Sequence, residues 1–201
     1  MLRQVYPVME TFYSVQGEGF FAGTPAFFIR LAGCDVGCVW CDVKESWDAA
    51  SHPSESIDTL VLKAKSSGAP ICVITGGEPL MYDLQPLSKA LQEAGIRTHL
   101  ETSGAHPLSG QWDWITFSPK KFKEPIAGFH AFANELKTVV YHRSDIEWSA
   151  KHASLVSEDC LQYMQPEWSR REEMQPFIFD FVKKNPRWRI SLQTHKYLGV
   201  D

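Results

Sequence analysis

Short apolar segments alternate with amphipathic segments along most of this chain, and this alternation restricts the fold more than any other feature. The apolar segments are rich in β-branched and aromatic residues, as buried strands are. They cover residues 26–31, 71–75, 98–102, 114–117, 136–141, 161–164 and 189–193. Helical periodicity lies between them, at residues 56–65, 84–94, 144–151 and 168–182. Strands that alternate with helices favour an α/β fold with parallel strands, whose sheet is open or curls towards a barrel.

The ends of the expected helices carry local signals. Ser56 is suited to cap the first helix, and Gly95 is suited to stop the second. Pro176 is expected to interrupt the last helix, because proline removes a helical hydrogen bond. Residues 49–55 are rich in serine and contain a proline, so we predict a loop there. With 201 residues and no linker or repeat, the chain is expected to form a single domain that spans residues 1–201.

Glycine-containing and polar segments follow almost every predicted strand. They lie at residues 33–41, 76–79, 103–104, 118–120, 165–166 and 194–196. In a parallel α/β fold the carboxyl ends of the strands share one face, and ligands bind at that face. The sequence therefore predicts one large site that is built from these segments.

Composition excludes several functional classes. The formal net charge is −4, so the chain has no basic excess for binding the phosphates of nucleic acids. No stretch of about 20 apolar residues is present to span a membrane, and the first residues do not resemble a signal peptide. Five cysteines without a signal peptide indicate a cytoplasmic location, where clustered cysteines bind metal or do chemistry. Two of the five, Cys72 and Cys160, are expected in the core.

The other three cysteines, Cys34, Cys38 and Cys41, lie close together in the sequence. Three interpretations are open at this point. The cysteines are ordinary core residues, or they hold a structural zinc ion with His52 as the fourth ligand, or they hold an iron–sulfur cluster. Three ligands on a [4Fe–4S] cluster would leave one iron free for a substrate or a cofactor, which suits catalysis.

The spacing of Cys34, Cys38 and Cys41 after the first predicted strand resembles the signature of the radical S-adenosylmethionine (SAM) enzymes. Residues 76–79 (GGEP), after the next strand, resemble the second motif of that superfamily, which binds the amino group of SAM. The resemblance implies that the three thiolates hold a [4Fe–4S] cluster and that its open iron binds SAM. One electron from the cluster then yields a 5′-deoxyadenosyl radical, which abstracts hydrogen. Trp40 would pack near the cluster and the adenosine.

Further motifs resemble one branch of the superfamily, the 7-carboxy-7-deazaguanine synthases. They lie at residues 12–19, 26–34, 101–104, 118–120, 165–166 and 193–196. The resemblance implies conversion of 6-carboxy-5,6,7,8-tetrahydropterin to 7-carboxy-7-deazaguanine with release of ammonia, on the route to queuosine and related 7-deazapurines. It also implies a single-domain, partial (β/α) barrel of the radical SAM type, a homodimer, and SAM that is regenerated as a cofactor. An electron donor such as flavodoxin or ferredoxin would be required.

The same resemblance gives expected roles to individual residues, and no catalytic side chain, because the reacting radical comes from the cofactor. Residues expected to bind the substrate are Val15, Gln16, Gly17, Arg30, Thr75, His195 and Asp201. Residues expected to bind SAM are Gly77, Glu78, Ser118, Pro119, Lys120, Gln165, Pro166, Glu167 and Trp168. Arg30 would face the substrate carboxylate, because a guanidinium donates in bidentate fashion. The terminal carboxylate, on Asp201, would reach the pterin edge.

The sequence departs from the family pattern at Val43. The family has a hydroxyl residue there, and its oxygen helps to bind Mg²⁺. Mg²⁺ requires oxygen ligands in near-octahedral geometry, and valine has no side-chain oxygen. Water, the substrate carboxylate or the adjacent Asp42 would have to replace that ligand. We therefore expect the Mg²⁺ dependence of the reaction to be weak or absent.

Two other functions remain open at the level of the sequence. A glycyl-radical-activating enzyme also combines three cysteines with SAM, but it acts on a protein partner and does not need the Gln16, Arg30 and His195 set. A zinc-binding module with three cysteines and one histidine would not be an enzyme. It would be colourless and would contain one zinc ion per chain.

Overall fold

A single curved sheet organises the chain. The computed structural model describes residues 4–200, and the strands in that part follow the order β3-β1-β2-β4-β5-β6-β7-β8-β9. All neighbours from β2 onward are parallel, which confirms the predicted α/β architecture. These strands are β2 (Pro25–Leu31), β4 (Ile71–Gly76), β5 (Arg97–Thr102), β6 (Trp114–Phe117), β7 (Glu135–Val140), β8 (Leu161–Pro166) and β9 (Trp188–Ile190).

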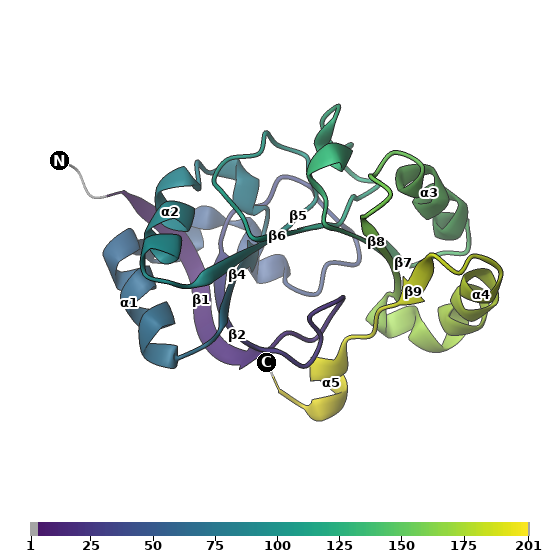
Figure 1. Cartoon of the computed structure of the whole chain (residues 1–201), viewed down its shortest axis with the longest axis horizontal. Coiled ribbons are helices and arrows are strands. Elements are labelled where there is room, and N and C mark those ends of the chain that lie inside the picture. Colours follow the sequence, from purple (N-terminus) through teal and green to yellow (C-terminus); the bar gives the residue numbers. More distant parts are fainter. Residues whose placement is uncertain (1–3, 201) are drawn as a thin grey trace.

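The sheet forms a partial barrel, as expected. Figure 1 shows the strands curving around a central space, with the longer helices outside and the short α5 (Thr194–Leu198) at the opening. The strands at the two ends of the strand order, β3 and β9, are not paired with each other, so the barrel does not close. The outer helices are α1 (Ile57–Ser67), α2 (Gln85–Glu93), α3 (Ser144–Ala153) and α4 (Arg171–Lys184). None of the helices found between residues 4 and 200 is both long and apolar enough to cross a membrane.

The N-terminal part differs from the expectation of parallel strands alone. Two strands that were not predicted, β1 (Val5–Val15) and β3 (Ser54–Ser56), pair in antiparallel fashion, β1 with both β2 and β3. Only residues 16–24 separate β1 from β2. A connection of that length permits an antiparallel hairpin, whereas parallel neighbours require a longer crossover.

The predicted helix boundaries are confirmed in part. The Ser56 side chain accepts a hydrogen bond from the Thr59 amide, as a capping residue does (3.2 Å). Residues 168–182, which were predicted as one helix, form the 3₁₀ turn η5 (Trp168–Arg170) followed by α4. Pro176 lies inside α4 and does not interrupt it, which corrects that expectation. The carbonyl that loses its partner belongs to Glu172, in the first turn, where the chain is open to water.

Two other predicted segments differ from the elements that the structure shows. The predicted loop 49–55 contains the 3₁₀ turn η2 (Ala49–Ser51) and runs into β3. The predicted strand 189–193 ends at Ile190, and α5 follows it. The remaining short turns are η1 (Lys44–Trp47), η3 (Pro79–Met81) and η4 (Phe129–Phe132). Cys72, in β4, and Cys160, directly before β8, are buried as expected.

Candidate active site

One cavity of about 280 Å³ lies at the carboxyl ends of the strands. It is lined by residues from β1, β2, β4, β5, β7 and β8, from the loops that follow several of these strands, and from α5. Most of the expected site residues line it: Val15, Gln16, Gly17, Arg30, Cys34, Cys38, Cys41, Val43, Thr75, Gly77, Glu78, Ser118, Lys120, Gln165, Glu167, Trp168 and His195.

Three expected site residues are not placed there. Pro119 lines a neighbouring cavity that shares Trp40, Lys120 and Val139 with the first one. Pro166 ends β8 and is not among the lining residues. Asp201 lies outside the described residues.

The three clustered cysteines are held by the loop that follows β2. Their thiols are free, Cys38 is buried, and Cys34 and Cys41 are half-buried. The loop is fixed at both ends, because Gly33 donates from its amide to Ser46 O (2.6 Å) and Cys41 donates to Cys38 O (3.0 Å). Burial raises the pKa of the Cys38 thiol to about 11 and also raises that of Cys34. Binding of iron would offset this cost, because the ligand is the thiolate.

These residues fit a cluster better than they fit a zinc ion. A four-iron cluster distributes its three thiolates over three iron atoms, and the three thiols face one cavity. Within residues 4–200, no three His, Cys, Asp or Glu side chains converge on a single-ion site. His52, the fourth ligand of the zinc hypothesis, is directed away: its Nε2 contacts Glu45 O at 2.7 Å.

The GGEP turn is packed directly against the cysteine loop. A Cβ atom on Gly77 would lie 2.1 Å from Gly33 O and 2.9 Å from Cys34 Cβ. The amide of Glu78 donates to Gly33 O (2.9 Å). A glycine is therefore required at position 77 so that the two backbones can approach each other.

The carboxylate of Glu78 is buried, and its oxygens accept hydrogen bonds from other residues of the chain. It accepts hydrogen bonds from the Thr102 hydroxyl (2.6 Å), the Ser103 amide (2.8 Å), the Ser103 hydroxyl and the Leu80 amide (3.1 Å). These bonds tie the GGEP turn to the loop after β5. The carboxylate therefore has a positioning role, although the residue lines the cavity.

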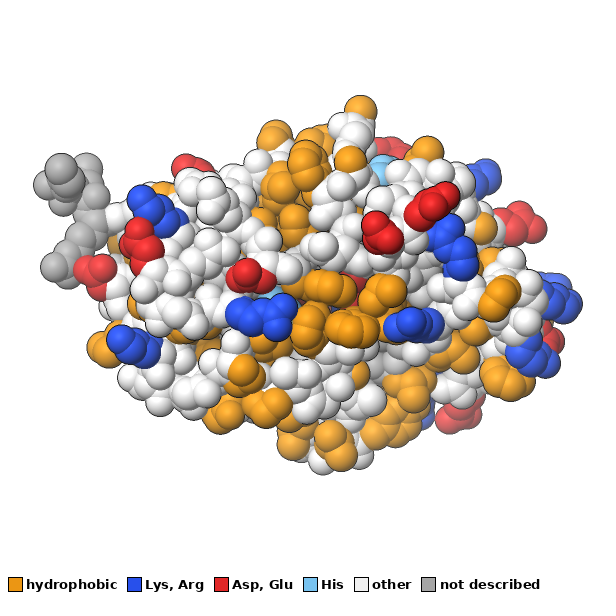
Figure 2. Space-filling view, viewed as in Figure 1, with side chains coloured by type: hydrophobic (Ala, Val, Ile, Leu, Met, Phe, Trp, Pro, Cys, Tyr) orange, Lys and Arg blue, Asp and Glu red, His pale blue; other side chains and the backbone are white. Residues whose placement is uncertain are grey.

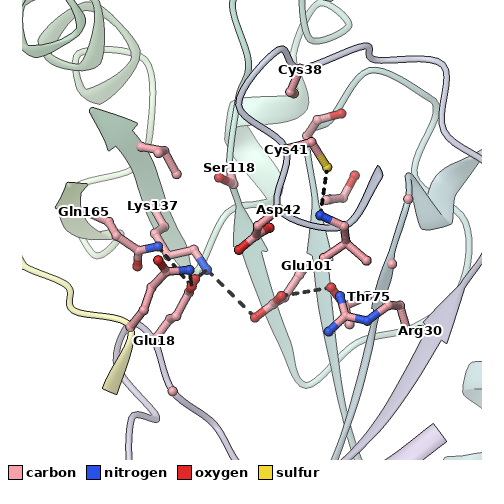
Figure 3. A pocket seen from close by; sticks show the side chains of 18 of the residues that line it. Glu18, Arg30, Cys38, Cys41, Asp42, Thr75, Glu101, Ser118, Lys137 and Gln165 are labelled. Carbon is pink, nitrogen blue, oxygen red and sulfur yellow. Dashed lines mark hydrogen bonds and ion pairs between the residues drawn. The ribbon is translucent and has the colours of Figure 1, made fainter. Parts of the chain in front are cut away.

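Two charged residues that sequence reasoning missed form one side of the cavity floor. Lys137, on β7, donates to the carboxylate of Glu18, and its Nζ lies 3.9 Å from Glu101 Oε1 (Figure 3). Glu18 also accepts from Gln165 Nε2 (3.0 Å) and Gln193 Nε2 (2.8 Å). Burial alone would raise the pKa of Glu18, but Lys137 and these hydrogen bonds lower it to about 2. The signal available in the sequence was a lysine inside an otherwise apolar strand segment.

The other side of the floor is centred on Glu101. Its two oxygens accept from Gln16 Nε2 (2.9 Å) and from Thr75 Oγ1 (3.0 Å). Arg30 lies near Thr75 in Figure 3. The Nε of Arg30 donates to Glu10 Oε1 (2.7 Å), and this bond leaves its two terminal nitrogens for another carboxylate.

The segment with α5 brings His195 to the cavity. Thr194 donates from its amide and its hydroxyl to Gly17 O, both at 2.9 Å. The imidazole of His195 packs against Gly17 so closely that a Cβ there would lie 1.9 Å from Nδ1. Burial lowers the pKa of His195, so the ring is neutral at pH 7.

Near the cysteines, the half-buried Lys120 forms a polar wall. Its Nζ donates to Ser118 O (2.5 Å) and Ser118 Oγ (2.7 Å) and lies 6.0 Å from the centroid of the Trp40 ring. Burial lowers the pKa of Lys120. Trp40 packs with the cysteines, and its expected contact with the adenosine stays a prediction.

The position expected to support Mg²⁺ offers few oxygens. Val43 lines the cavity with an apolar side chain. The neighbouring carboxylate, Asp42, pairs with Lys196 on α5 (2.7 Å). The side chains at positions 42 and 43 therefore do not fit a Mg²⁺ site well, because valine has no oxygen ligand and the Asp42 carboxylate already has a cation as its partner.

Comparisons with known proteins agree with this site. The Radical SAM superfamily matches residues 28–126, which include the cysteines and the GGEP turn. The chain is 52% identical to a 7-carboxy-7-deazaguanine synthase from Synechocystis sp., over 100% of this chain and 96% of that protein. It is 49% identical to one from Flavobacterium psychrophilum, over 98% and 93% of the two chains.

A solved structure is similar over almost the whole chain. The crystal structure of QueE from Escherichia coli superposes with a TM-score of 0.83 at 34% identity and covers 95% of both chains. The same bacterium's 7-carboxy-7-deazaguanine synthase is 35% identical over 97% of this chain and 99% of its own length.

Proposed function

This chain belongs to the 7-carboxy-7-deazaguanine synthases of the radical SAM superfamily, and from that premise we propose the details of its reaction. The substrate is 6-carboxy-5,6,7,8-tetrahydropterin, and the products are 7-carboxy-7-deazaguanine and ammonia. The observation that carries the proposal is one cavity in which three free cysteines lie opposite a floor of carboxylate, amide and hydroxyl groups. A small enclosed substrate suits that cavity better than a protein segment does, which disfavours a glycyl-radical-activating function.

Cys34, Cys38 and Cys41 are the residues proposed to hold the cluster. SAM is proposed to lie between the cysteine loop and the strand ends, against Gly77, Ser118, Lys120, Gln165, Glu167 and Trp168. When bound, the cluster and SAM supply the one-electron chemistry that generates a hydrogen-abstracting radical. The chain itself binds and orients the substrate and keeps that chemistry away from water.

The substrate is proposed to lie on the floor, with its carboxylate at Arg30. Because Glu10 holds Nε of Arg30, the remaining fork is fixed in direction and suited to a carboxylate. Gln16, Thr75 and His195 line the same space and are proposed to contact the pterin. A contact from the terminal carboxylate of Asp201 is proposed as well.

Several wider properties are also proposed. The chain acts as a single domain in the cytoplasm and receives electrons from a carrier such as flavodoxin or ferredoxin. It works as a homodimer, and exposed apolar side chains of the C-terminal segment supply a candidate surface. Figure 2 shows hydrophobic side chains over the region of α5, where Tyr197 and Leu198 are largely exposed.

Anaerobic reconstitution with iron and sulfide tests the function. The protein should turn brown, cleave SAM when it is reduced, and form 7-carboxy-7-deazaguanine when the tetrahydropterin is added. A Cys38→Ala variant should lose all three properties, whereas the matched control Cys160→Ala should keep them, because Cys160 lies outside the cavity. Brown protein that cleaves SAM but forms no product would refute the proposed substrate. Colourless protein with one zinc per chain would refute the cluster.

Magnesium dependence gives a separate prediction. Turnover of the unaltered chain should change less than about 3-fold when Mg²⁺ is replaced by a chelator, because Val43 has no side-chain oxygen and the Asp42 carboxylate is paired with Lys196. The Val43→Thr variant restores a side-chain oxygen and should respond more strongly to added Mg²⁺. Equal, steep responses of both proteins would contradict this prediction. Initial rates over a Mg²⁺ titration provide the measurement.

A further inference from the structure

A buried cation, Lys137, lies in the floor of the cavity. The side chain of Lys137 is only 6% exposed, and its ammonium faces Glu18 and Glu101 (Figure 3). A third carboxyl group, Glu135, is on the same face of β7, two residues away. Burial raises the pKa of Glu135 to about 7, whereas the three carboxyl groups together raise the pKa of Lys137 above its usual range. Lys137 therefore remains a cation at the centre of an acidic cluster.

The acidic groups around Lys137 fix the direction of the surrounding hydrogen bonds. A carboxylate accepts hydrogen bonds and cannot donate them, so the two glutamines that contact Glu18 must both present their NH₂ groups to it. For Gln165, this leaves the amide oxygen free to accept from the Ser191 hydroxyl at 2.7 Å. The Glu18 amide donates to Gln16 Oε1 at 3.2 Å, so the Gln16 NH₂ group is directed to Glu101.

The same reasoning defines what the floor offers to a ligand. Thr75 has one hydroxyl proton, and it donates that proton to Glu101 (3.0 Å). The hydroxyl oxygen of Thr75 can then only accept, and the lone pairs of Glu101 can only accept. Both residues line the cavity. The Glu101–Thr75 part of the floor is therefore complementary to a ligand edge that carries N–H donors.

We propose that Lys137 is a positioning residue that determines specificity. Its charge keeps Glu101 and Thr75 as hydrogen-bond acceptors. The floor therefore selects the guanidine-like edge of a pterin, which carries an amino group. This inference rests on the proposed function, because it takes the pterin as the ligand. Loss of the ammonium would leave the half-buried Glu18 and Glu101 facing each other's charge without a cation between them, which favours the protonated form of a carboxyl group. A protonated carboxyl donates as well as accepts, so the floor would lose its preference.

Two oxidised ligands that cannot turn over test this inference. The first, 6-carboxypterin, has an amino group at C2, and the second, 6-carboxylumazine, has a carbonyl oxygen there. Dissociation constants are measured by anaerobic ultrafiltration with the cluster-loaded enzyme and SAM, without a reductant. The unaltered enzyme should prefer the pterin by about 30-fold or more, because a mismatched polar edge leaves buried groups unpaired. The Lys137→Met variant should prefer it by less than about 3-fold.

The control is Lys89→Met, which removes an exposed lysine on α2 that pairs with Glu93 (3.7 Å). It should keep the full preference. If Lys137→Met does not fold, the double variant Glu18→Gln/Lys137→Met is used, since it removes the buried charges as a pair and keeps the hydrogen-bonding groups. A merely structural role would weaken both ligands equally and leave their ratio unchanged.

The outcomes separate the two proposals. An unchanged ratio in Lys137→Met, or in the double variant where that one replaces it, overturns the role of Lys137, and so does the absence of a preference in the unaltered enzyme. If the unaltered enzyme binds neither ligand and does not convert the tetrahydropterin, the proposed function fails first. A ratio that falls in the Lys137 variants and is retained in Lys89→Met supports the inference.

Discussion

Replacement of Gly77 by alanine is expected to remove most of the bound iron and to lower turnover by about 100-fold or more. The added Cβ would lie 2.1 Å from Gly33 O, and it cannot fit unless one of the two backbones moves. The segment that must move leads directly into Cys34, whose Cβ is only 2.9 Å away. Displacement of a reacting group by about 1 Å costs about 100-fold in rate. Iron per chain and initial rate after reconstitution provide the two measurements.

A second glycine variant separates this clash from backbone strain. Gly68 caps α1 with a φ of 68°, and a Cβ there would meet nothing within 4 Å. Gly68→Ala should therefore cost about 1 kcal/mol of stability and leave both iron content and turnover unchanged. Gly77 is not among the glycines with positive φ, so its substitution acts through contact alone. Full iron content and full turnover in Gly77→Ala would show that the two loops are not coupled.

Most of the strands that sequence reasoning found have both faces covered, whereas the predicted strand at 189–193 corresponds to the short and mostly exposed β9. β4 and β6 are almost wholly buried, so each appears in the sequence as an apolar run. β1 was missed because most of its residues are half-buried or exposed and the segment has no such run. Its pairing with β2 and β3 determines its structure, and the pairing with β3 joins residues as distant in sequence as Val5 and Ser56.

The residues of the candidate site also fall into those that the sequence predicts and those that only the structure shows. The cysteines and the GGEP turn could be found because each is a compact motif with fixed spacing. The pairing of Glu18 with Lys137 could not be found, because 119 residues separate them and neither residue type identifies its partner. The Asp42–Lys196 pair joins residues 154 apart for the same reason. Motifs therefore identified the cysteines and the GGEP turn, whereas the charged pairs of the cavity became visible only in the folded chain.

Replacement of Glu78 by alanine is expected to cause a large loss of stability. The carboxylate is 1% exposed and accepts from the Thr102 hydroxyl, the Ser103 amide and the Leu80 amide. Alanine would leave these donors buried without partners, at a cost of about 3–5 kcal/mol. For a chain of this size, that lowers Tm by roughly 6–20 °C. Thermal unfolding of the cluster-free protein, followed by circular dichroism, measures the effect.

The matched control is Glu93→Ala on α2, where the glutamate is 67% exposed and its pairing with Lys89 at 3.7 Å is weak. That change should cost less than about 0.5 kcal/mol. Glu78→Gln keeps one acceptor oxygen, so it should lie between the alanine variant and the unaltered chain. Melting temperatures of Glu78→Ala and Glu93→Ala within 2 °C of each other, on the order of the control's own cost, would contradict the prediction. The order alanine, glutamine, glutamate in rising Tm is expected because each step restores acceptors to the loop after β5 and thereby fixes the GGEP turn against the cysteines.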